Sequence, residues 1–337
     1  MRDLLKALAN AHGTPGHEEG IAQRVVQELE AAAMVVSRDL MGNVIATREG
    51  SSPGPRIMLC AHMDEVGGLV RHVDREGFVR FDAAGSHNPR VLAGSRVLIG
   101  GTVHGVVQSA KGLDESSLSV DDLYIDIGAR DADEAERAGV RIGSPVTRVP
   151  SFQGLVGSRV MGKALDNRAG LCALLTAMRR LRDFPGTVVA VASCQEEVGT
   201  RGAQIAAYAV RPDLAVAIDV TFAHDTPQRK SDRFINTRLG KGPALTLKDD
   251  GCILGQRMRA LVEGAAHDAG IALQYDISPG KTDAAPVSLS RGGVPTAALL
   301  VPLRYMHGGS EIVDLDDVSS LADLLCAVIR RAPAYGD

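Results

Sequence analysis

Apolar segments of strand length alternate with segments of helical periodicity through most of the chain. Residues 57–61 form an unbroken apolar run, and similar runs occupy 187–193, 214–218 and 296–301. Runs of this kind are typical of strands that are buried on both faces of a sheet. Between them, apolar residues recur every three or four positions, as over 167–182, which is the spacing of an amphipathic helix. The alternation predicts an α/β fold with a mixed, mostly parallel sheet flanked by helices.

The sequence changes character between residues 67 and 155, where short β-branched runs are separated by Gly, Pro and Asp turns. That pattern predicts a small β-barrel or sandwich. A chain of 337 residues has room for about two domains. We therefore expect one catalytic α/β domain, made of residues 1–66 and 156–337, that is interrupted by an inserted β domain over 67–155.

Composition argues against several kinds of partner. Lys plus Arg number 37 and Asp plus Glu number 41, a formal net charge of −4, so there is no basic surplus for nucleic acid or an anionic membrane surface. No stretch reaches the roughly 18 apolar residues of a membrane span, and the charged first residues do not resemble a signal peptide. The five Cys are scattered, without a Cys-x-x-Cys pair. We expect reduced thiols in a cytoplasmic protein, with a nucleophilic role left open for Cys60 and Cys194.

Side chains that can bind metal follow the predicted strands or precede the predicted helix at 167–182. They are His62, Asp64, Asp166, Glu196, Glu197, Asp219 and His307. The carboxyl ends of parallel strands meet at one edge of a sheet, where ligands of α/β proteins bind. We therefore expect these side chains to converge at that edge.

Two histidines and several carboxylates without a thiolate are the ligand set of a catalytic site for a zinc-like ion. Asp166, Glu197 and Asp219 carry three negative charges, which two divalent cations would balance with one charge left for a hydroxide. Taken singly, each residue also has an ordinary structural explanation: Asp166 is a possible N-cap, the two Glu a solvated turn, and each His a surface or core residue. Their joint occurrence at one edge favours metal.

The adjacent Glu196 and Glu197 suggest a division of roles. Neighbouring residues of an extended chain point in opposite directions, so we assign Glu197 to a metal ion and Glu196 to general base. Glu196 would take the proton of the water that becomes a metal-bridging hydroxide and pass it to a leaving amine. Asp64 is expected to accept the imidazole N–H of His62 and fix its ligating tautomer; the alternative is an aspartate in a turn.

Six different motifs lie along the chain between about residues 10 and 310. They are Thr14-Pro15-Gly16-His17-Glu18-Glu19, Ala61-His62-Met63-Asp64-Glu65-Val66-Gly67, Lys163-Ala164-Leu165-Asp166-Asn167-Arg168-Ala169-Gly170, Gln195-Glu196-Glu197-Val198-Gly199, Ala217-Ile218-Asp219-Val220-Thr221 and Arg304-Tyr305-Met306-His307. Together and in this order they resemble the tetrahedral (TET, glutamyl/deblocking) aminopeptidase family of metallopeptidases, some of whose members are labelled endoglucanases.

The resemblance implies a zinc-exopeptidase-like fold and a site for two ions. One ion would be held by His62, Asp166 and Asp219 and the other by Asp166, Glu197 and His307, so that Asp166 bridges them. The resemblance also implies that the β insert serves assembly, into dimers that build hollow dodecamers.

Departures from the family pattern bear on the substrate. The loop after His307 reads Gly-Gly where the family has Ser-Pro, which loosens the segment that carries a ligand. Lys281 precedes Thr282 and Asp283 where a second Gly is common, and it places a cation near the cleft. We expect Lys281, Thr282 and Asp283 to contact the substrate, and Lys281 to favour an acidic side chain. For Thr282 the alternative is an N-cap of a helix over 283–290.

The predicted function is a metal-dependent aminopeptidase that removes N-terminal residues from peptides with two divalent ions per chain, zinc or cobalt. Alternatives are a related metallo-deacylase or dipeptidase and a non-catalytic metal-binding family member. A glycoside hydrolase would use Glu196 and Glu197 as its two carboxylates, usually beside aromatic platforms. The chain has no Trp and 3% aromatic residues, which argues against that activity.

Overall fold

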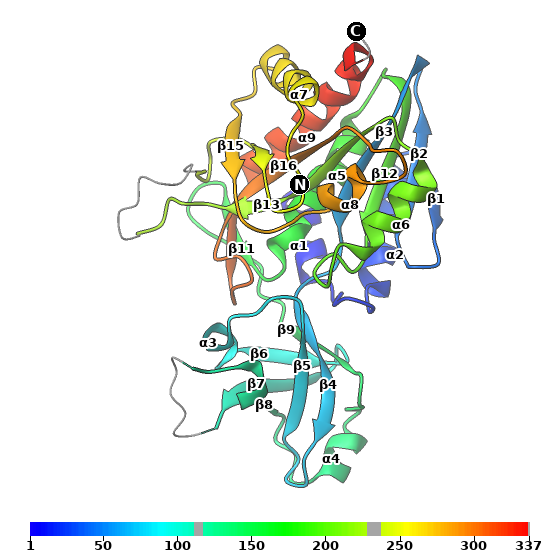
Figure 1. Ribbon diagram of the computed structural model, residues 1–337. Coiled ribbons are helices and arrows are strands. Elements are labelled where there is room, and N and C mark those ends of the chain that lie inside the picture. The colour runs from blue at the N-terminus through cyan, green and yellow to red at the C-terminus, as the bar shows by residue number, and fades with distance from the viewer. Residues whose placement is uncertain (111–116, 228–236, 336–337) are drawn as a thin grey trace.

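The computed structural model describes residues 1–110, 117–227 and 237–335. A layered α/β part contains an eleven-stranded sheet, and a closed six-stranded barrel projects from one end of it (Figure 1). The mixed sheet flanked by helices and the inserted β-barrel that the sequence predicts are both confirmed.

The large sheet runs in the order β1-β2-β12-β3-β13-β16-β17-β11-β10, and β14 joins it through β16 and carries β15. Its strands are β1 (Val35–Arg38), β2 (Val44–Glu49), β3 (Ser52–His62), β10 (Gln153–Gly154), β11 (Arg159–Gly162), β12 (Pro185–Ser193), β13 (Leu214–Phe222), β14 (Ala244–Lys248), β15 (Gln274–Ile277), β16 (Thr296–Arg304) and β17 (Glu311–Asp314). The central strands β12, β3, β13 and β16 are parallel, and the pairs toward either end of this order are antiparallel. On the branch from β16, β14 is antiparallel to β16 and parallel to β15. The parallel core brings four strand ends to one edge of the sheet.

Strand β3 shows why the apolar runs are unbroken. Its residues Ile57 and Leu59 belong to the larger core on one face of the sheet, and Met58 and Cys60 belong to a smaller core on the other face. Because successive side chains of a strand point to opposite faces, a strand covered on both sides needs an apolar residue at every position.

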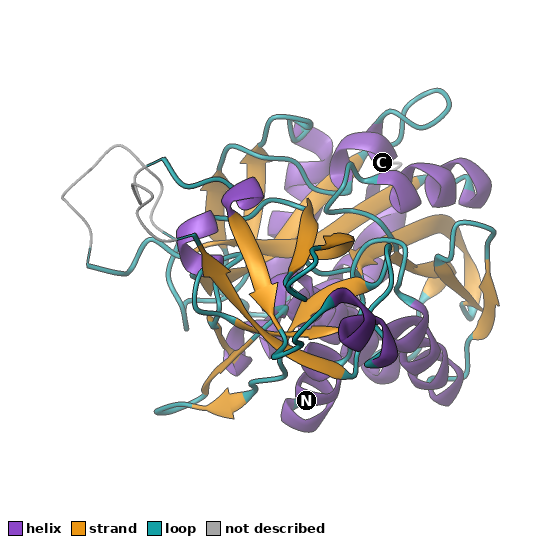
Figure 2. Ribbon diagram, turned by 90° about the horizontal axis from the view of Figure 1, so that it is seen from below, coloured by secondary structure: helices purple, strands orange, loops and turns teal. Residues whose placement is uncertain are grey.

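Helices cover both faces of this sheet (Figure 2). They are α1 (Arg2–Asn10), α2 (Glu19–Ala31), α5 (Leu165–Arg180), α6 (Arg201–Val210), α7 (Gln256–Asp268), α8 (Ala284–Ser288) and α9 (Leu315–Arg331). The larger core holds α1, α2, α5, α7 and α9, while α6 packs on the opposite face with α8 beside it. Within the described residues, no helix combines the length and the apolar character that crossing a membrane requires.

The barrel closes in the order β4-β5-β8-β7-β6-β9. Its elements are β4 (Gly67–Val73), β5 (Val79–Ala84), α3 (Pro89–Leu92), β6 (Arg96–Ile99), β7 (Val103–Ser109), β8 (Leu123–Asp126), α4 (Ala132–Arg137) and β9 (Pro145–Arg148). Its interior is a separate apolar cluster that includes Phe81, Ile99 and Ile125. The barrel leaves the large sheet just after β3 and returns just before β10.

Candidate metal centre

The metal-binding candidates converge at the carboxyl edge of the parallel strands, as the sequence predicts. His62 ends β3 and Asp219 lies within β13, whereas Glu197 and His307 follow β12 and β16. Asp166 sits at the start of α5, where its own backbone and that of the next residue are not helical. These five side chains and that of Glu196 line one cavity of about 350 Å³.

Two groups of potential ligands share Asp166. His62, Asp166 and Asp219 form one group, and Asp166, Glu197 and His307 form the other; within each group the ligand atoms lie within 4.8 Å of one another. Nε2 of His62 is 3.3 Å from Oδ1 of Asp166, and Nε2 of His307 is 3.2 Å from Oδ2 of the same carboxylate. Bonds of roughly 2.0–2.1 Å to a tetrahedral ion would separate two ligands by about 3.3–3.4 Å. The observed spacings therefore suit a divalent ion in each group.

The charges of the cavity also favour cations. Burial first, and then the negative charge of Asp166, raise the pKa of Glu197 to about 7, and burial and Asp166 also raise the pKa of Asp219. Oε1 of Glu197 is buried without a hydrogen-bond partner among the described residues. Burial would lower the pKa of His307, but Asp166 and Glu197 raise it to about 11. A buried cluster of acceptors with too few donors is a setting that bound cations would stabilise.

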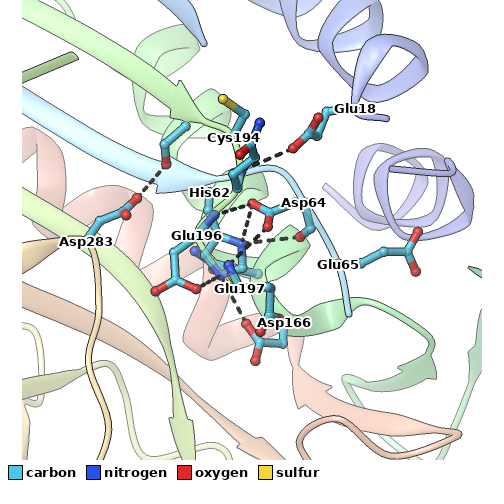
Figure 3. A network of polar contacts seen from close by, with 12 residues as sticks. Glu18, His62, Asp64, Glu65, Asp166, Cys194, Glu196, Glu197 and Asp283 are labelled. Carbon is cyan, nitrogen blue, oxygen red and sulfur yellow. Dashed lines mark hydrogen bonds and ion pairs between the residues drawn. The ribbon is translucent and has the colours of Figure 1, made fainter. Parts of the chain in front are cut away.

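Glu196 belongs to neither ligand group. Its carboxylate lines the cavity and lies 3.9 Å from Nε2 of His62 (Figure 3). Burial, followed by the nearby carboxylates of Asp219, Asp283 and Glu197, raises its pKa well above the usual value, against the opposing effect of His62.

Asp64 orders this region through the backbone. The fully buried carboxylate accepts hydrogen bonds from the N–H of Glu196 at 3.0 Å and of Glu197 at 3.1 Å (Figure 3). Nδ1 of His62 lies 3.4 Å from the same carboxylate and 3.2 Å from the carbonyl oxygen of Asp64. Asp64 thus contacts the imidazole on the side away from the cavity and also fixes the adjacent pair of glutamates.

Two further side chains continue this pattern and were missed at the sequence level. Oδ1 of Asn43 accepts from the N–H of Cys194 at 3.0 Å, and Oε1 of Glu18 accepts from the N–H of Gln195 at 3.1 Å. Four successive N–H groups, from Cys194 to Glu197, are therefore held by buried side-chain oxygens. Nothing in the sequence distinguishes Glu18 from its neighbour Glu19, because only the fold shows that Glu18 points inward.

Glu18→Ala is expected to lower the free energy of unfolding by about 1–3 kcal/mol, because it leaves the partly buried Gln195 N–H without its acceptor. It should also lower kcat by up to about 10²-fold, since a small displacement of a catalytic group is costly. Glu18→Gln keeps an acceptor oxygen and should recover most of both losses. Chemical denaturation and steady-state kinetics measure the two effects.

Glu19 supplies the matched control. It is exposed and pairs with Arg38 at the surface, so Glu19→Ala should change neither stability nor kcat measurably. Equal effects of the two alanine variants would contradict the role of Glu18.

Glu311 is a second residue that sequence reasoning missed. Its carboxylate is buried and accepts from the N–H of Asp166 at 3.0 Å and from the N–H of His307 at 2.8 Å. Burial, with a contribution from Asp166, raises its pKa to about 8. Glu311 thus joins the backbones of two candidate ligands that are far apart in the sequence.

The candidate substrate residues do not all lie where the sequence places them. Lys281 and Thr282 line the cavity. Oγ1 of Thr282 also accepts from the N–H of Ala284 at 3.3 Å, so the expected capping bond is present even though Asp283 occupies the N-cap position. Asp283 is buried behind the cavity wall, where it accepts hydrogen bonds from Ser193 and Cys60. Its position corrects the expectation that it contacts the substrate.

The cysteines are all free. Burial raises the pKa of Cys60 well above its usual value and that of Cys194 to about 12. Both thiols are therefore poor sources of the thiolate that nucleophilic catalysis needs.

Comparison with known proteins places this chain in a family. Residues 42–324 match the M42 glutamyl aminopeptidase family. The lysyl aminopeptidase of Pyrococcus furiosus is 35% identical over 98% of this chain and 96% of its own length. An aminopeptidase from the archaeon Desulfurococcus kamchatkensis has a structure with a TM-score of 0.94 and 32% identity, over 99% of this chain and 95% of that one. The TET1 peptidase of Pyrococcus horikoshii can assemble into a tetrahedron or a large octahedral shell. Its structure has a TM-score of 0.87 and 30% sequence identity, over 97% of this chain and 98% of that one.

These similarities extend over nearly the whole chain, including the barrel. They agree with the resemblance of the six motifs and with the fold. The chain belongs to the M42 glutamyl aminopeptidase family.

Proposed function

We propose that the cavity holds two divalent cations and hydrolyses the peptide bond after the first residue of a peptide. The observation that carries this proposal is the position of Asp166, whose two oxygens face the two histidines at 3.3 Å and 3.2 Å. One ion is assigned to His62, Asp166 and Asp219, and the other to Asp166, Glu197 and His307. Zinc and cobalt both accept imidazole and carboxylate ligands, and we propose either of them as the native ion.

The mechanism divides the work between the ions and the chain. When bound, two such ions would lower the pKa of a water molecule in the cavity and would polarise the scissile carbonyl. The chain contributes Glu196, whose carboxylate takes the proton of the attacking water and delivers it to the leaving amine. Asp64 keeps Glu196 and Glu197 in place through their N–H groups, so that the base and the ligand keep a fixed separation.

Substrate recognition is assigned to the cavity wall that includes Lys281 and Thr282. Lys281 carries a positive charge on this wall, so we propose a preference for an acidic first side chain. The relative from Pyrococcus furiosus is a lysyl aminopeptidase. Acidic and basic substrates therefore have to be compared directly on this chain.

Aminoacyl p-nitroanilides with a free amine should be cleaved, and their N-acetylated counterparts should react at least about 10²-fold more slowly in kcat/KM, because a site built for the amine rejects its blocked form. Glutamyl, leucyl and lysyl substrates in the same panel measure side-chain preference. Faster cleavage of N-acetylated substrates would instead indicate a deacylase. Two bound ions without cleavage of any substrate would indicate a non-catalytic metal-binding protein.

We also propose self-association into dimers that build a dodecamer, with the barrel as the assembly module. The tetrahedral and octahedral assemblies of the Pyrococcus horikoshii peptidase support self-association, and the mass from light scattering tests whether this chain forms a dodecamer. The five free cysteines, four of them buried, support a reducing compartment such as the cytoplasm.

A further inference from the structure

The barrel reaches the metal centre through Arg148, the last residue of β9. The Arg148 side chain is largely buried, and one of its terminal nitrogens donates a hydrogen bond to the carbonyl oxygen of His307 at 3.1 Å. Within the described residues, this is the only hydrogen bond of its guanidinium, and Nε has no partner. Burying a guanidinium costs desolvation free energy. Here the hydrogen bond that offsets part of this cost goes to the backbone of a candidate metal ligand.

The peptide of His307 is held from two sides. Its N–H donates to Glu311 and its carbonyl accepts from Arg148. His307 has a left-handed backbone, with φ of +57°, which is uncommon for a residue other than Gly. Gly308 and Gly309 follow. The N–H of Gly308 donates to the carbonyl oxygen of Tyr305 at 2.8 Å, and an added Cβ at Gly308 would clash with that oxygen, whereas a Cβ at Gly309 would meet nothing within 4 Å. Besides this local turn, the side chains of Glu311 and Arg148 hold the two polar groups of the His307 backbone.

The barrel segment also approaches a second ligand of the same group, Glu197. Gly85, which follows β5 with a φ of +90°, lies so close to Glu197 that an added Cβ would be 3.3 Å from the Glu197 Cβ. Glu197 and His307 belong to one candidate ion site, whereas His62 and Asp219 of the other site come from β3 and β13 of the large sheet. The barrel therefore contacts the two sites unequally.

We propose that Arg148 is a positioning residue for the ion held by Asp166, Glu197 and His307, and that the barrel thereby sets the affinity of this ion and not of the other. This inference rests on the proposed function. It gives the barrel a role within each chain, separate from assembly: the segment inserted after β3 supports one of the two ligand groups that the α/β part supplies.

The test measures Co²⁺ binding by calorimetry to chelator-treated protein in which one site at a time is kept. Asp219→Asn leaves the site that contains His307, and His307→Ala leaves the site that contains Asp219. In the first background Arg148→Met should weaken Co²⁺ binding by about 10- to 100-fold, the usual effect of removing a group that orients a ligand. In the second background it should change the affinity less than twofold.

Two further variants sharpen this result. Arg148→Lys keeps a charged donor and should recover part of the lost affinity, and it replaces the Met variant if circular dichroism shows that the latter does not fold. Arg71, also in the barrel, pairs with Asp121 at the surface, so Arg71→Met should bind Co²⁺ like its parent in both backgrounds.

The outcomes separate the two proposals. Equal weakening in both backgrounds, or no weakening in either, would overturn the role of Arg148 while leaving the two-ion site intact. Failure of the unsubstituted protein to bind two Co²⁺ ions would instead overturn the proposed function.

Discussion

Glu196→Gln is expected to lower kcat by about 10²- to 10⁴-fold while two metal ions stay bound, because the amide cannot accept a proton. Glu196 lines the cavity but belongs to neither ligand group, so its replacement leaves every assigned ligand in place. The substitution also keeps the shape of the side chain. Hydrolysis of aminoacyl p-nitroanilides, together with metal analysis of the same sample, measures both parts of the expectation.

Glu263 provides the control for this substitution. It lies on the surface of α7, where it pairs with Arg259 and accepts from Tyr275, and Glu263→Gln should leave kcat unchanged. If Glu196→Gln retained the activity of the unsubstituted enzyme, another group would have to move the proton. If it lost activity together with its metal, Glu196 would be a ligand and not the base.

Asp166→Ala is expected to have a larger effect, since this side chain is the one residue common to both ligand groups. Its loss removes one of the three negative charges that offset two cations and leaves each site with two protein ligands. Metal content should fall from two ions to less than one per chain, and activity should fall beyond the roughly 10⁴-fold upper range expected from losing a general base alone.

Asp219→Asn is the matched comparison, because Asp219 belongs to one group only. This variant should keep about one ion per chain. Equal metal loss in the Asp166 and Asp219 variants would contradict the assignment of Asp166 as the shared ligand, and circular dichroism of both proteins excludes unfolding as the cause.

The convergence of the candidate ligands could be predicted from the sequence because the fold makes their positions regular. His62, Asp219 and Glu197 lie at or near the ends of apolar runs that proved to be parallel strands of one sheet. A topological rule then brings them to the same edge. The way in which Asp166 is shared did not follow from spacing; it came from the resemblance, and the structure brings the two groups together in that arrangement.

The residues that hold the ligand-bearing segments in place could not be predicted from the sequence. Glu18, Asn43, Glu311 and Arg148 act through hydrogen bonds to backbone groups of segments that are remote in sequence, except that Glu311 also binds the nearby His307. Neither residue type nor periodicity marks such a role, because a buried glutamate and an exposed one look alike in a sequence. The expectation that Asp283 contacts the substrate was wrong for a related reason, because a carboxylate that follows a loop can also point into the core.

Several strands were also missed. β14 and β17 are short, and β17 ends in an acidic segment that continues into α9. Their side chains do not form the long apolar runs of the central strands. Both pair with β16, and β14 also pairs with β15 and β17 with β11. Such pairing is a property of the folded chain that local pattern cannot supply.

We propose that two ions per chain share Asp166 and that both are required for activity. The most direct test removes metal with a chelator, adds back Zn²⁺ or Co²⁺ in measured steps, and follows both bound metal and the cleavage of an aminoacyl p-nitroanilide. The metal-free protein should be inactive, and its activity should rise to a plateau at two bound ions per chain. Full turnover by the metal-free protein, or a plateau at one ion, would contradict it.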